Sequence, residues 1–348
     1  MRKKLIISDI HLGVQRNAGT TPKTAAAIKA YLLSNLRELM FAHLDKDIII
    51  NGDLFDTFNV PLNDVYGFFL VCKDWLEFGK GSLTLAEGNH DLSKNSVNMP
   101  SIAFLAGALN SERVFLVEST YHDTEAGIYI IPHIANQDMF DLELTKAALL
   151  TNQLILVHAN YDNNFTLQSD HSLNISKERA KELVANNNTL LFGHVHQYDN
   201  PTERVIVAGN QWPSSVADCL GNNNKKAFIF DPSSRSVNSI ETWTAKGSFA
   251  EIAWDELDQA GEFQFVRVVG KCGTSEAAIM LAAISKYRQR SEAFVVTNAV
   301  SVAGVVDMQD LPNSLETVKG FDVLGYLFEN LEPEQVVVVK GLLEKQNA

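Results

Sequence analysis

The strongest constraint on this chain is a set of polar segments that each follow a short apolar run directly. Five such runs have the length and composition of buried strands: Lys4–Ile7, Ile48–Ile50, Ser82–Ala86, Leu154–Val157 and Thr189–Phe192. The polar segments after them are Ser8-Asp9-Ile10-His11, Asn51-Gly52-Asp53, Gly88-Asn89-His90-Asp91, His158 and Gly193-His194-Val195-His196. Because α/β sheets bind ligands beyond the carboxyl ends of their strands, these segments are predicted to form one site.

The side chains of these segments are oxygen and imidazole ligands of the kind that divalent metals prefer. They comprise two Asp, one Asn and four or five His, without Cys, which favours Mn, Fe, Zn or Mg over a structural thiolate zinc site. Each segment alone has an ordinary structural explanation: Asn51-Gly52 is a common turn, and a lone His158 could be a core histidine. Taken together and in this order, they predict a hydrolase with two metal ions.

Size, charge and cysteine content limit the other possibilities. The 348 residues suffice for one large domain and a smaller one. Asp and Glu outnumber Lys and Arg by 42 to 29, giving a net charge of −13, so we expect weak unaided binding to nucleic acid. No stretch reaches the roughly 20 apolar residues of a membrane span. The widely spaced Cys72, Cys219 and Cys272 favour reduced thiols in a cytoplasmic protein.

Alternating apolar runs and helical segments predict an α/β catalytic domain over residues 1–247. One helix is expected at Thr24–Phe41, and the polar stretch Asn160–Asn174 is expected to be a loop on the substrate side. After Asn110 the apolar runs shorten, which predicts a second sheet packed on the first. Its strands are expected at Val114–Val117, Gly127–Ile131, Arg204–Val207, Lys226–Phe230 and Val237–Glu241.

The remainder of the chain carries no metal-ligand pattern. Residues 248–312 predict a smaller βαβ-like unit, with strands at Phe263–Val269 and Phe294–Val302 and a helix at Ser275–Ile284. Residues 313–348 predict two apolar-faced helices separated by Pro333. We expect these helices either to complete a core or to dock on a partner.

The order Asp-x-His, Gly-Asp, Gly-Asn-His-Asp, His and Gly-His-x-His, over about residues 5–200, resembles the calcineurin-like metallophosphoesterases. The resemblance implies a two-sheet α/β sandwich flanked by helices and two divalent ions. Mn²⁺ is favoured, with Mg²⁺, Fe²⁺ and Zn²⁺ as alternatives. It further implies that one ion is held by Asp9, His11 and His196, the other by Asn89, His158 and His194, and that Asp53 bridges them.

The same resemblance implies roles for the remaining residues of the Gly-Asn-His-Asp segment. His90 would protonate the leaving oxygen or stabilise charge at the phosphorus centre. Asp91 would orient the His90 ring, or alternatively would only cap the turn.

Three stretches resemble the SbcD type, the bacterial and phage counterpart of the eukaryotic double-strand-break repair nuclease subunit: His11-Leu12-Gly13, Gly52–Asp56 and Gly193–His196. Val205–Asp218 resembles the Gly-Ser-Pro stretch of that type, although it has Gly209-Asn210 in place of Gly-Ser. This resemblance implies a DNA exo- or endonuclease with a cap domain, whose C-terminal helices dock on a coiled-coil ATPase of the SbcC type. The resemblance to the SbcD type is also compatible with a homodimer. The compact length and Asn-rich loops are closer to phage subunits, which would act in the host cytoplasm.

Other members of the superfamily fit less well. Ser/Thr phosphatases follow Gly-Asp with an Arg-bearing motif and end in Gly-Asn-His-Glu, whereas Asp91 ends the motif here. Lipid A pathway pyrophosphatases share an Asp-Leu-Phe-Asp stretch but lack an appended unit. Hydrolases of cyclic nucleotides or other small phosphodiesters remain the alternative, because a fold does not determine a substrate. A non-catalytic scaffold of the same fold is a remote alternative, because a scaffold would be expected to have lost ligands and every ligand position is intact here.

Overall fold

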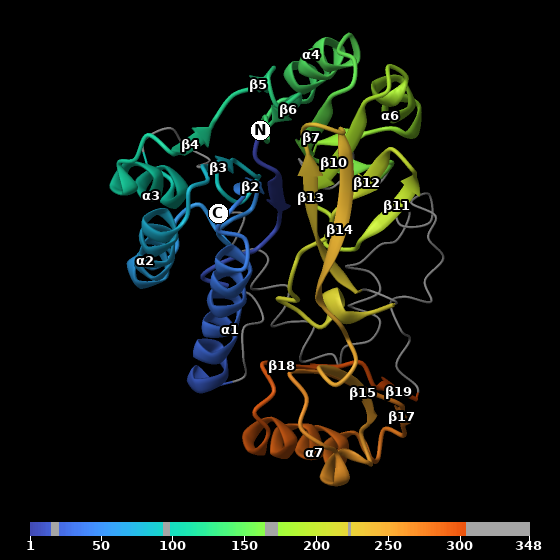
Figure 1. Cartoon of the computed structure of the whole chain (residues 1–348). Helices are drawn as coiled ribbons and strands as arrows, with labels where there is room; N and C mark the ends of the chain where they lie inside the picture. Colours follow the sequence, from blue (N-terminus) through green and yellow to red (C-terminus); the bar gives the residue numbers. More distant parts are fainter. Residues whose placement is uncertain (15–20, 93–97, 164–172, 222–223, 304–348) are drawn as a thin grey trace, which may run out of the picture.

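The computed structural model describes residues 1–14, 21–92, 98–163, 173–221 and 224–303. Two large sheets with helices on their outer faces form the main body, and a smaller α/β unit follows it in the chain (Figure 1). The α/β fold class predicted from the sequence is confirmed. The helices expected within residues 313–348 lie outside the described residues.

The first sheet has six strands in the order β14-β13-β1-β2-β3-β4. Strands β1 to β4 are parallel, and the hairpin of β13 and β14 extends the sheet antiparallel to β1. The strands are β1 (Lys4–Ile7), β2 (Asp47–Asn51), β3 (Leu83–Ala86), β4 (Val114–Val117), β13 (Lys225–Asp231) and β14 (Ser236–Trp243). The parallel register pairs Ile7 with Ile50 and Asn51 with Ala86, so these three carboxyl ends lie at one edge.

The second sheet also has six strands, in the order β11-β12-β10-β7-β6-β5. These are β5 (Tyr121–Asp123), β6 (Ile128–Ile131), β7 (Leu154–His158), β10 (Thr189–Gly193), β11 (Asp199–Thr202) and β12 (Val205–Val207). The expected division between the sheets is therefore wrong in part. The runs at Val114–Val117, Lys226–Phe230 and Val237–Glu241 belong to the first sheet. Strands β7 and β10, at whose ends predicted ligands lie, belong to the second.

Alternating burial explains why the two sheets pack face to face. Ile6 of β1 and Ile49 of β2 point between the sheets, where they meet Leu156 and Leu191 of the second sheet. Their neighbours along each strand point the other way, into the helical layers. Successive strand residues face opposite sides, so strands that are apolar throughout can bury both faces. The result is a helix–sheet–sheet–helix sandwich.

Among the described residues, the helices on the outer faces are α1 (Pro22–Phe41), α2 (Leu62–Phe78), α3 (Ser101–Leu109), α4 (Gln137–Ala148) and α6 (Lys177–Val184). The first three share an apolar cluster with the first sheet, and α4 and α6 share one with the second. Helix α1 confirms the predicted helix. It begins with a capping box, in which the side chains of Thr21 and Thr24 each bind the other's backbone N–H, and Pro22 occupies its first turn.

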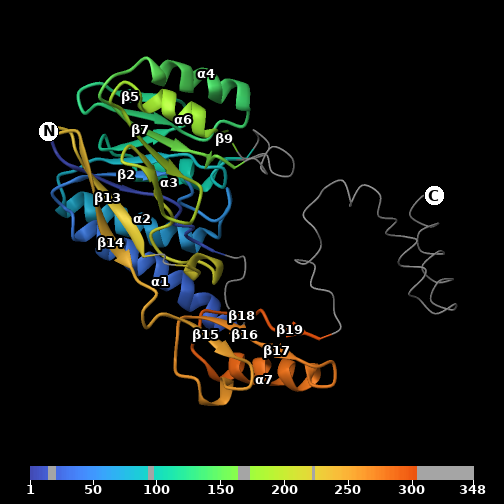
Figure 2. The same cartoon turned by 90° about the vertical axis from the view of Figure 1, so that its right-hand side faces the viewer.

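The appended unit has a three-stranded parallel sheet in the order β15-β16-β18. It consists of β15 (Phe249–Ala253), β16 (Phe265–Val269), β18 (Val295–Asn298) and α7 (Ala277–Arg290), with the short pair β17 (Lys271–Cys272) and β19 (Ser301–Val302). Strands β16 and β18 with the intervening helix confirm the predicted βαβ order. Phe265 and Phe294 pack against Tyr31 of α1, so the unit lies next to that helix (Figures 1 and 2).

Two further features bear on the sequence predictions. Cys72, Cys219 and Cys272 are buried free thiols, as expected. Within the described ranges, no helix combines the length and apolar character needed to cross a membrane. The stretch expected as a loop at Asn160–Asn174 begins with β8 (Asn160–Tyr161) and leads into β9 (Asn174–Ile175), while residues 164–172 are not described.

Candidate metal centre

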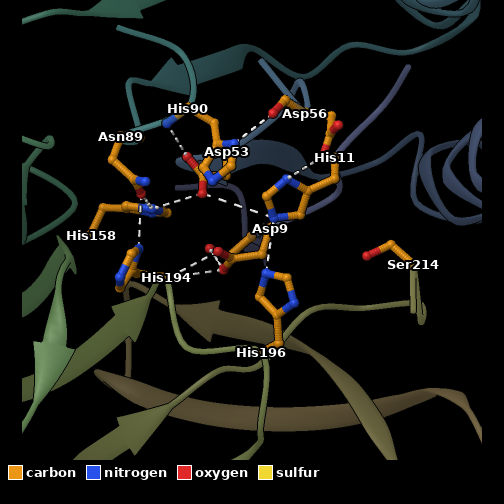
Figure 3. A network of polar contacts seen from close by, with 12 residues as sticks. Asp9, His11, Asp53, Asp56, Asn89, His90, His158, His194, His196 and Ser214 are labelled. Atoms are coloured by element: carbon orange, nitrogen blue, oxygen red, sulfur yellow. Dashed lines mark hydrogen bonds and ion pairs between the residues drawn. The ribbon is translucent and has the colours of Figure 1, made fainter. Parts of the chain in front are cut away.

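The carboxyl ends of five strands bring the predicted ligands together (Figure 3). Strands β1, β2 and β3 of the first sheet and β7 and β10 of the second end at this position, on facing edges of the sandwich. All seven residues predicted as ligands contribute side chains here: Asp9, His11, Asp53, Asn89, His158, His194 and His196. The site therefore lies between the two sheets.

The first group consists of Asp9, His11 and His196, whose ligand atoms lie within 4.8 Å of one another. The Nε2 atoms of His11 and His196 are 2.9 Å apart. The Asp9 carboxylate accepts hydrogen bonds from the Ser8 hydroxyl and from the backbone N–H of His194, which joins the two sheets. Two imidazole nitrogens this close to one another and to a carboxylate form a donor set suited to a divalent cation.

The second group consists of Asp53, His158 and His194, again within 4.8 Å. The side-chain oxygen of Asn89 lies between the two rings, 3.1 Å from His158 Nε2 and 2.8 Å from His194 Nδ1. This amide oxygen can only accept hydrogen bonds or bind a cation. Two imidazoles, a carboxylate and an amide oxygen thus converge on a second position.

Asp53 lies between the groups. Its Oδ2 atom is 3.3 Å from His158 Nε2 and 3.9 Å from His11 Nε2. Its Oδ1 atom accepts a hydrogen bond of 2.9 Å from the backbone N–H of His90, which fixes the carboxylate in this orientation. The carboxylate can therefore reach ions in both groups.

The hydrogen bonds behind the rings set which nitrogen faces the centre. His158 Nδ1 donates to the backbone carbonyl of Asn51 at 3.0 Å, and His196 Nδ1 donates to the carboxylate of Asp218 at 2.8 Å. These tautomers follow from the acceptors, since neither a carbonyl nor a carboxylate oxygen has a proton to give. In both rings Nε2 is then the nitrogen that faces the centre, and in the neutral ring it carries the lone pair that would bind a cation.

Burial and charge perturb the pKa values of the same groups. Burial and the neighbouring His196 lower the pKa of His11 to about 4, so its ring is neutral at neutral pH. Burial also lowers the pKa of His158, but the carboxylate of Asp53 outweighs it and raises the pKa to about 10. Although burial opposes it, the facing imidazoles hold the pKa of Asp53 well below its usual range.

The His158 pKa gives a pH prediction. A metal ligand must be a neutral imidazole, so a cation has to displace the proton that His158 holds below about pH 10. Between pH 6 and 9 the affinity of the second group for Mn²⁺ should rise with pH, by about tenfold per unit, and binding to this group at pH 7.5 should release about one proton. Isothermal titration in buffers of different ionisation enthalpy measures this release, and a pH-independent affinity would contradict the prediction.

The backbone at the site adopts conformations that side chains rarely take. Asp9, His11, Asp53 and His194 have φ of 54°, 52°, 50° and 88°. Such residues cost of order 1–3 kcal/mol each and cluster at functional sites. At Gly52, with φ of +89°, a Cβ would lie 2.0 Å from His158 Nδ1, so only glycine lets this ring approach β2.

His90 lies beside the first group, and one of its ring nitrogens is within 4.8 Å of the ligand atoms of His11 and Asp53. Its Nδ1 atom donates to the backbone carbonyl of Asp56. The carboxylate of Asp91 instead accepts from the backbone N–H groups of Gly88, Leu54 and Phe55. These bonds agree with the alternative prediction, a turn-capping role for Asp91, and none of the hydrogen bonds described joins its carboxylate to the His90 ring.

Sequence reasoning missed several residues around the centre. The Asp218 carboxylate accepts a hydrogen bond from the His196 ring. The Asp56 carboxylate lies 3.7 Å from His11 Nδ1, and its backbone carbonyl accepts from His90. The fully buried Lys225 donates to the backbone carbonyl of His196. His133 follows β6, with its ring centroid 6.5 Å from that of His158, and burial lowers its pKa to about 4. The position of His133 after an apolar run was the available signal, since it repeats the pattern of the ligands.

Comparison with known proteins adds three findings. The family model described as Calcineurin-like phosphoesterase matches residues 3–232. Among solved structures, the crystal structure of Pseudomonas putida nuclease MPE is 14% identical, covering 68% of this chain and 87% of that chain, with a TM-score of 0.28. A search of curated proteins found no match. The family match includes every side chain of the two ligand groups, and the chain belongs to the calcineurin-like phosphoesterase family.

Proposed function

We propose that this protein is a two-metal phosphodiesterase that cleaves DNA with Mn²⁺. The observation that carries the proposal is the convergence of two donor groups on one shared carboxylate, Asp53. Paired metal sites of this kind suit phosphoryl transfer, because they act on both the attacking and the leaving oxygen. The donors are imidazole and oxygen without thiolate, which suits Mn²⁺ and leaves Mg²⁺, Fe²⁺ and Zn²⁺ as alternatives.

In this proposal the two groups hold one cation each. Asp9, His11 and His196 would bind the first, Asn89, His158 and His194 the second, and Asp53 both. The cations would polarise the phosphodiester and activate a water molecule near neutral pH.

His90 is proposed to act on the leaving group rather than on the metals. Its Nδ1–H donates to the Asp56 carbonyl, which leaves Nε2 as the ring nitrogen that would act on the substrate. In a ring protonated at both nitrogens, Nε2–H would give its proton to the leaving oxygen or donate a hydrogen bond to the developing charge. The Asp91 carboxylate accepts from the backbone of Gly88, in the loop that carries His90, and from Leu54 and Phe55, which follow β2. These bonds hold that loop close to the end of β2.

The test uses the purified chain with labelled linear duplex DNA, single-stranded DNA and bis-p-nitrophenyl phosphate. We expect Mn²⁺-dependent hydrolysis that chelation abolishes and that Mg²⁺, Fe²⁺ or Zn²⁺ supports to different extents. Cleavage of DNA supports the nuclease. Hydrolysis of the small diester but not of DNA, even after addition of a coiled-coil ATPase of the SbcC type, would favour the small-molecule phosphodiesterase. If the chain bound both metals but hydrolysed none of the substrates, the result would favour a non-catalytic scaffold.

The acidic composition is the observation that favours the small-molecule alternative. A net charge of −13 opposes an approach to the DNA backbone, whose binding depends on basic side chains. We propose that a coiled-coil ATPase of the SbcC type supplies the DNA-binding surface, and that the pair acts in repair or recombination in the cytoplasm. Duplex cleavage should then rise steeply on adding that partner and fall with salt.

The partner proposal predicts a separation of functions at the carboxyl end of the chain. Truncation at about Glu332 should abolish binding to the ATPase and leave hydrolysis of bis-p-nitrophenyl phosphate unchanged. Analytical size exclusion of each variant, with and without the partner, measures binding and also tests the proposed homodimer. An equal loss of small-diester activity would instead show that the segment belongs to the catalytic core.

A further inference from the structure

Residues of the segment 218–225 hold both the ring and the backbone of His196. The ring Nδ1 donates to Asp218 Oδ1 at 2.8 Å, and the backbone carbonyl accepts from Lys225 Nζ at 2.8 Å. His196 follows β10 of the second sheet, whereas Lys225 begins β13 of the first. The ligand is thus fixed across the junction of the two sheets.

Asp218 is itself held rigidly. It lies in the 3₁₀ turn Ala217–Cys219 and is only 3% exposed. While Oδ1 faces His196, Oδ2 accepts from the backbone N–H groups of Ser214 and Ser215, at 2.9 and 2.8 Å, and from the Ser214 hydroxyl at 3.1 Å. The carboxylate therefore has little freedom to turn away from the ring. Figure 3 shows Ser214 on the same side of the centre as His196.

His158 and His196, one from each group, differ in the acceptor that binds their Nδ1–H. In the second group, His158 Nδ1 donates to a neutral backbone carbonyl, that of Asn51. In the first group, His196 donates to a full carboxylate. A carboxylate behind a metal-binding histidine fixes its tautomer and makes the ring a stronger ligand than a neutral acceptor does.

We propose that Asp218 is a positioning residue for His196, and that it sets the metal affinity of the first group through the Nδ1 hydrogen bond. This inference rests on the proposed two-metal function. It assigns no contact with substrate to Asp218, because the residue acts through the His196 ring. The second group, whose members have no hydrogen bond to Asp218 among those described, keeps its affinity.

The test compares Asp218→Asn with the unaltered full chain by titration with Mn²⁺, followed calorimetrically and by the electron paramagnetic resonance of free Mn²⁺. We expect two sites in the unaltered chain. In the variant one site should weaken by about 10–100-fold while the other is unchanged. With bis-p-nitrophenyl phosphate, the Mn²⁺ concentration for half-maximal rate should rise by a similar factor, and kcat at saturating Mn²⁺ should change little.

Asp47→Asn is the matched control. Asp47 is also a buried carboxylate that pairs with a lysine, Lys4, and accepts a backbone N–H, that of Ser82, but it lies at the opposite end of β2. It should leave both Mn²⁺ affinities unchanged. If Asp218→Asn fails to fold, Ser214→Ala replaces it: loss of one donor to Oδ2 should weaken the same site severalfold.

The outcomes separate the two proposals. Two unaltered Mn²⁺ affinities in a folded Asp218→Asn chain would overturn the positioning role and leave the two-metal function standing. Fewer than two Mn²⁺ sites in the unaltered chain would overturn the two-metal function itself. Equal weakening of both sites in the variant would also contradict the inference, because it would indicate a general structural role.

Discussion

Replacing Asp53 by asparagine should remove both metals and with them the activity. The carboxylate places one oxygen near both ligand groups, 3.3 Å from His158 Nε2 and 3.9 Å from His11 Nε2. An amide keeps the size of the side chain but loses the negative charge that two cations would share. We expect Mn²⁺ content to fall from two to less than one per chain and hydrolysis to fall by about 10³-fold, equivalent to about 4 kcal/mol.

Metal content by mass spectrometry and the rate with bis-p-nitrophenyl phosphate measure these effects on the same preparation. Asp47→Asn is again the control, because it replaces a buried carboxylate at the start of β2, the end of the strand remote from the site, whereas Asp53 follows the other end. Full metal occupancy in a folded Asp53→Asn protein would refute the bridging role. Loss of one ion alone would show that Asp53 serves a single group.

Replacing His90 by alanine should instead remove turnover and leave the metals in place. The ring lies beside the centre and is held by the Asp56 carbonyl, while the residue's contact with Asp53 is made by its backbone N–H, which alanine keeps. Loss of a positioned acid or charge-stabilising group costs typically about 10²–10⁴-fold in rate. We therefore expect kcat to fall within this range at unchanged Mn²⁺ content.

His122→Ala provides the comparison for this substitution. His122 lies in β5, where its ring packs on Tyr129 and its Nε2 contacts the Gln153 side chain, outside the ligand groups. Its rate and its metal content should both match those of the unaltered chain. If His90→Ala lost metal and activity in equal measure, His90 would be a ligand rather than a group acting on the substrate.

Together the two substitutions separate metal binding from proton transfer. Asp53→Asn should lose metal and rate together, whereas His90→Ala should lose rate alone. This contrast follows from position: the Asp53 side chain lies between both sets of ligand atoms, while the His90 ring lies at one side of the first set.

The five strands that lead to the predicted ligands and the helix at 24–41 could be predicted from the sequence because their signals are local. An apolar run predicts a buried strand from its composition, and helical spacing predicts an amphipathic helix, without reference to the rest of the chain. The prediction that the ligands meet also rests on a general property of α/β sheets, whose strand ends carry binding sites. The assignment of seven of these side chains as metal ligands rests in addition on the resemblance to the calcineurin-like metallophosphoesterases, and it stays a prediction.

Sheet membership could not be predicted in the same way. Val114–Val117 and Lys226–Phe230 look like the strands of the second sheet, yet β4 and β13 pair with the first. Pairing depends on which edge is available in three dimensions, and strand composition alone does not encode it. The contacts of Asp91 could not be predicted for a similar reason, since its partners Leu54 and Phe55 are 36 residues or more away in the chain.

The sequence by itself determined which side chains bind metal in this proposal, because residue type and position after a strand are local properties. The resemblance to the calcineurin-like metallophosphoesterases also implied how they divide into two groups and that Asp53 lies between them. Only the tertiary structure decided the distances within these groups, and that Asp218 and Lys225 hold His196. These contacts join separate strands, turns and sheets. Their geometry depends on register and on the packing of one sheet against the other, which no single segment specifies.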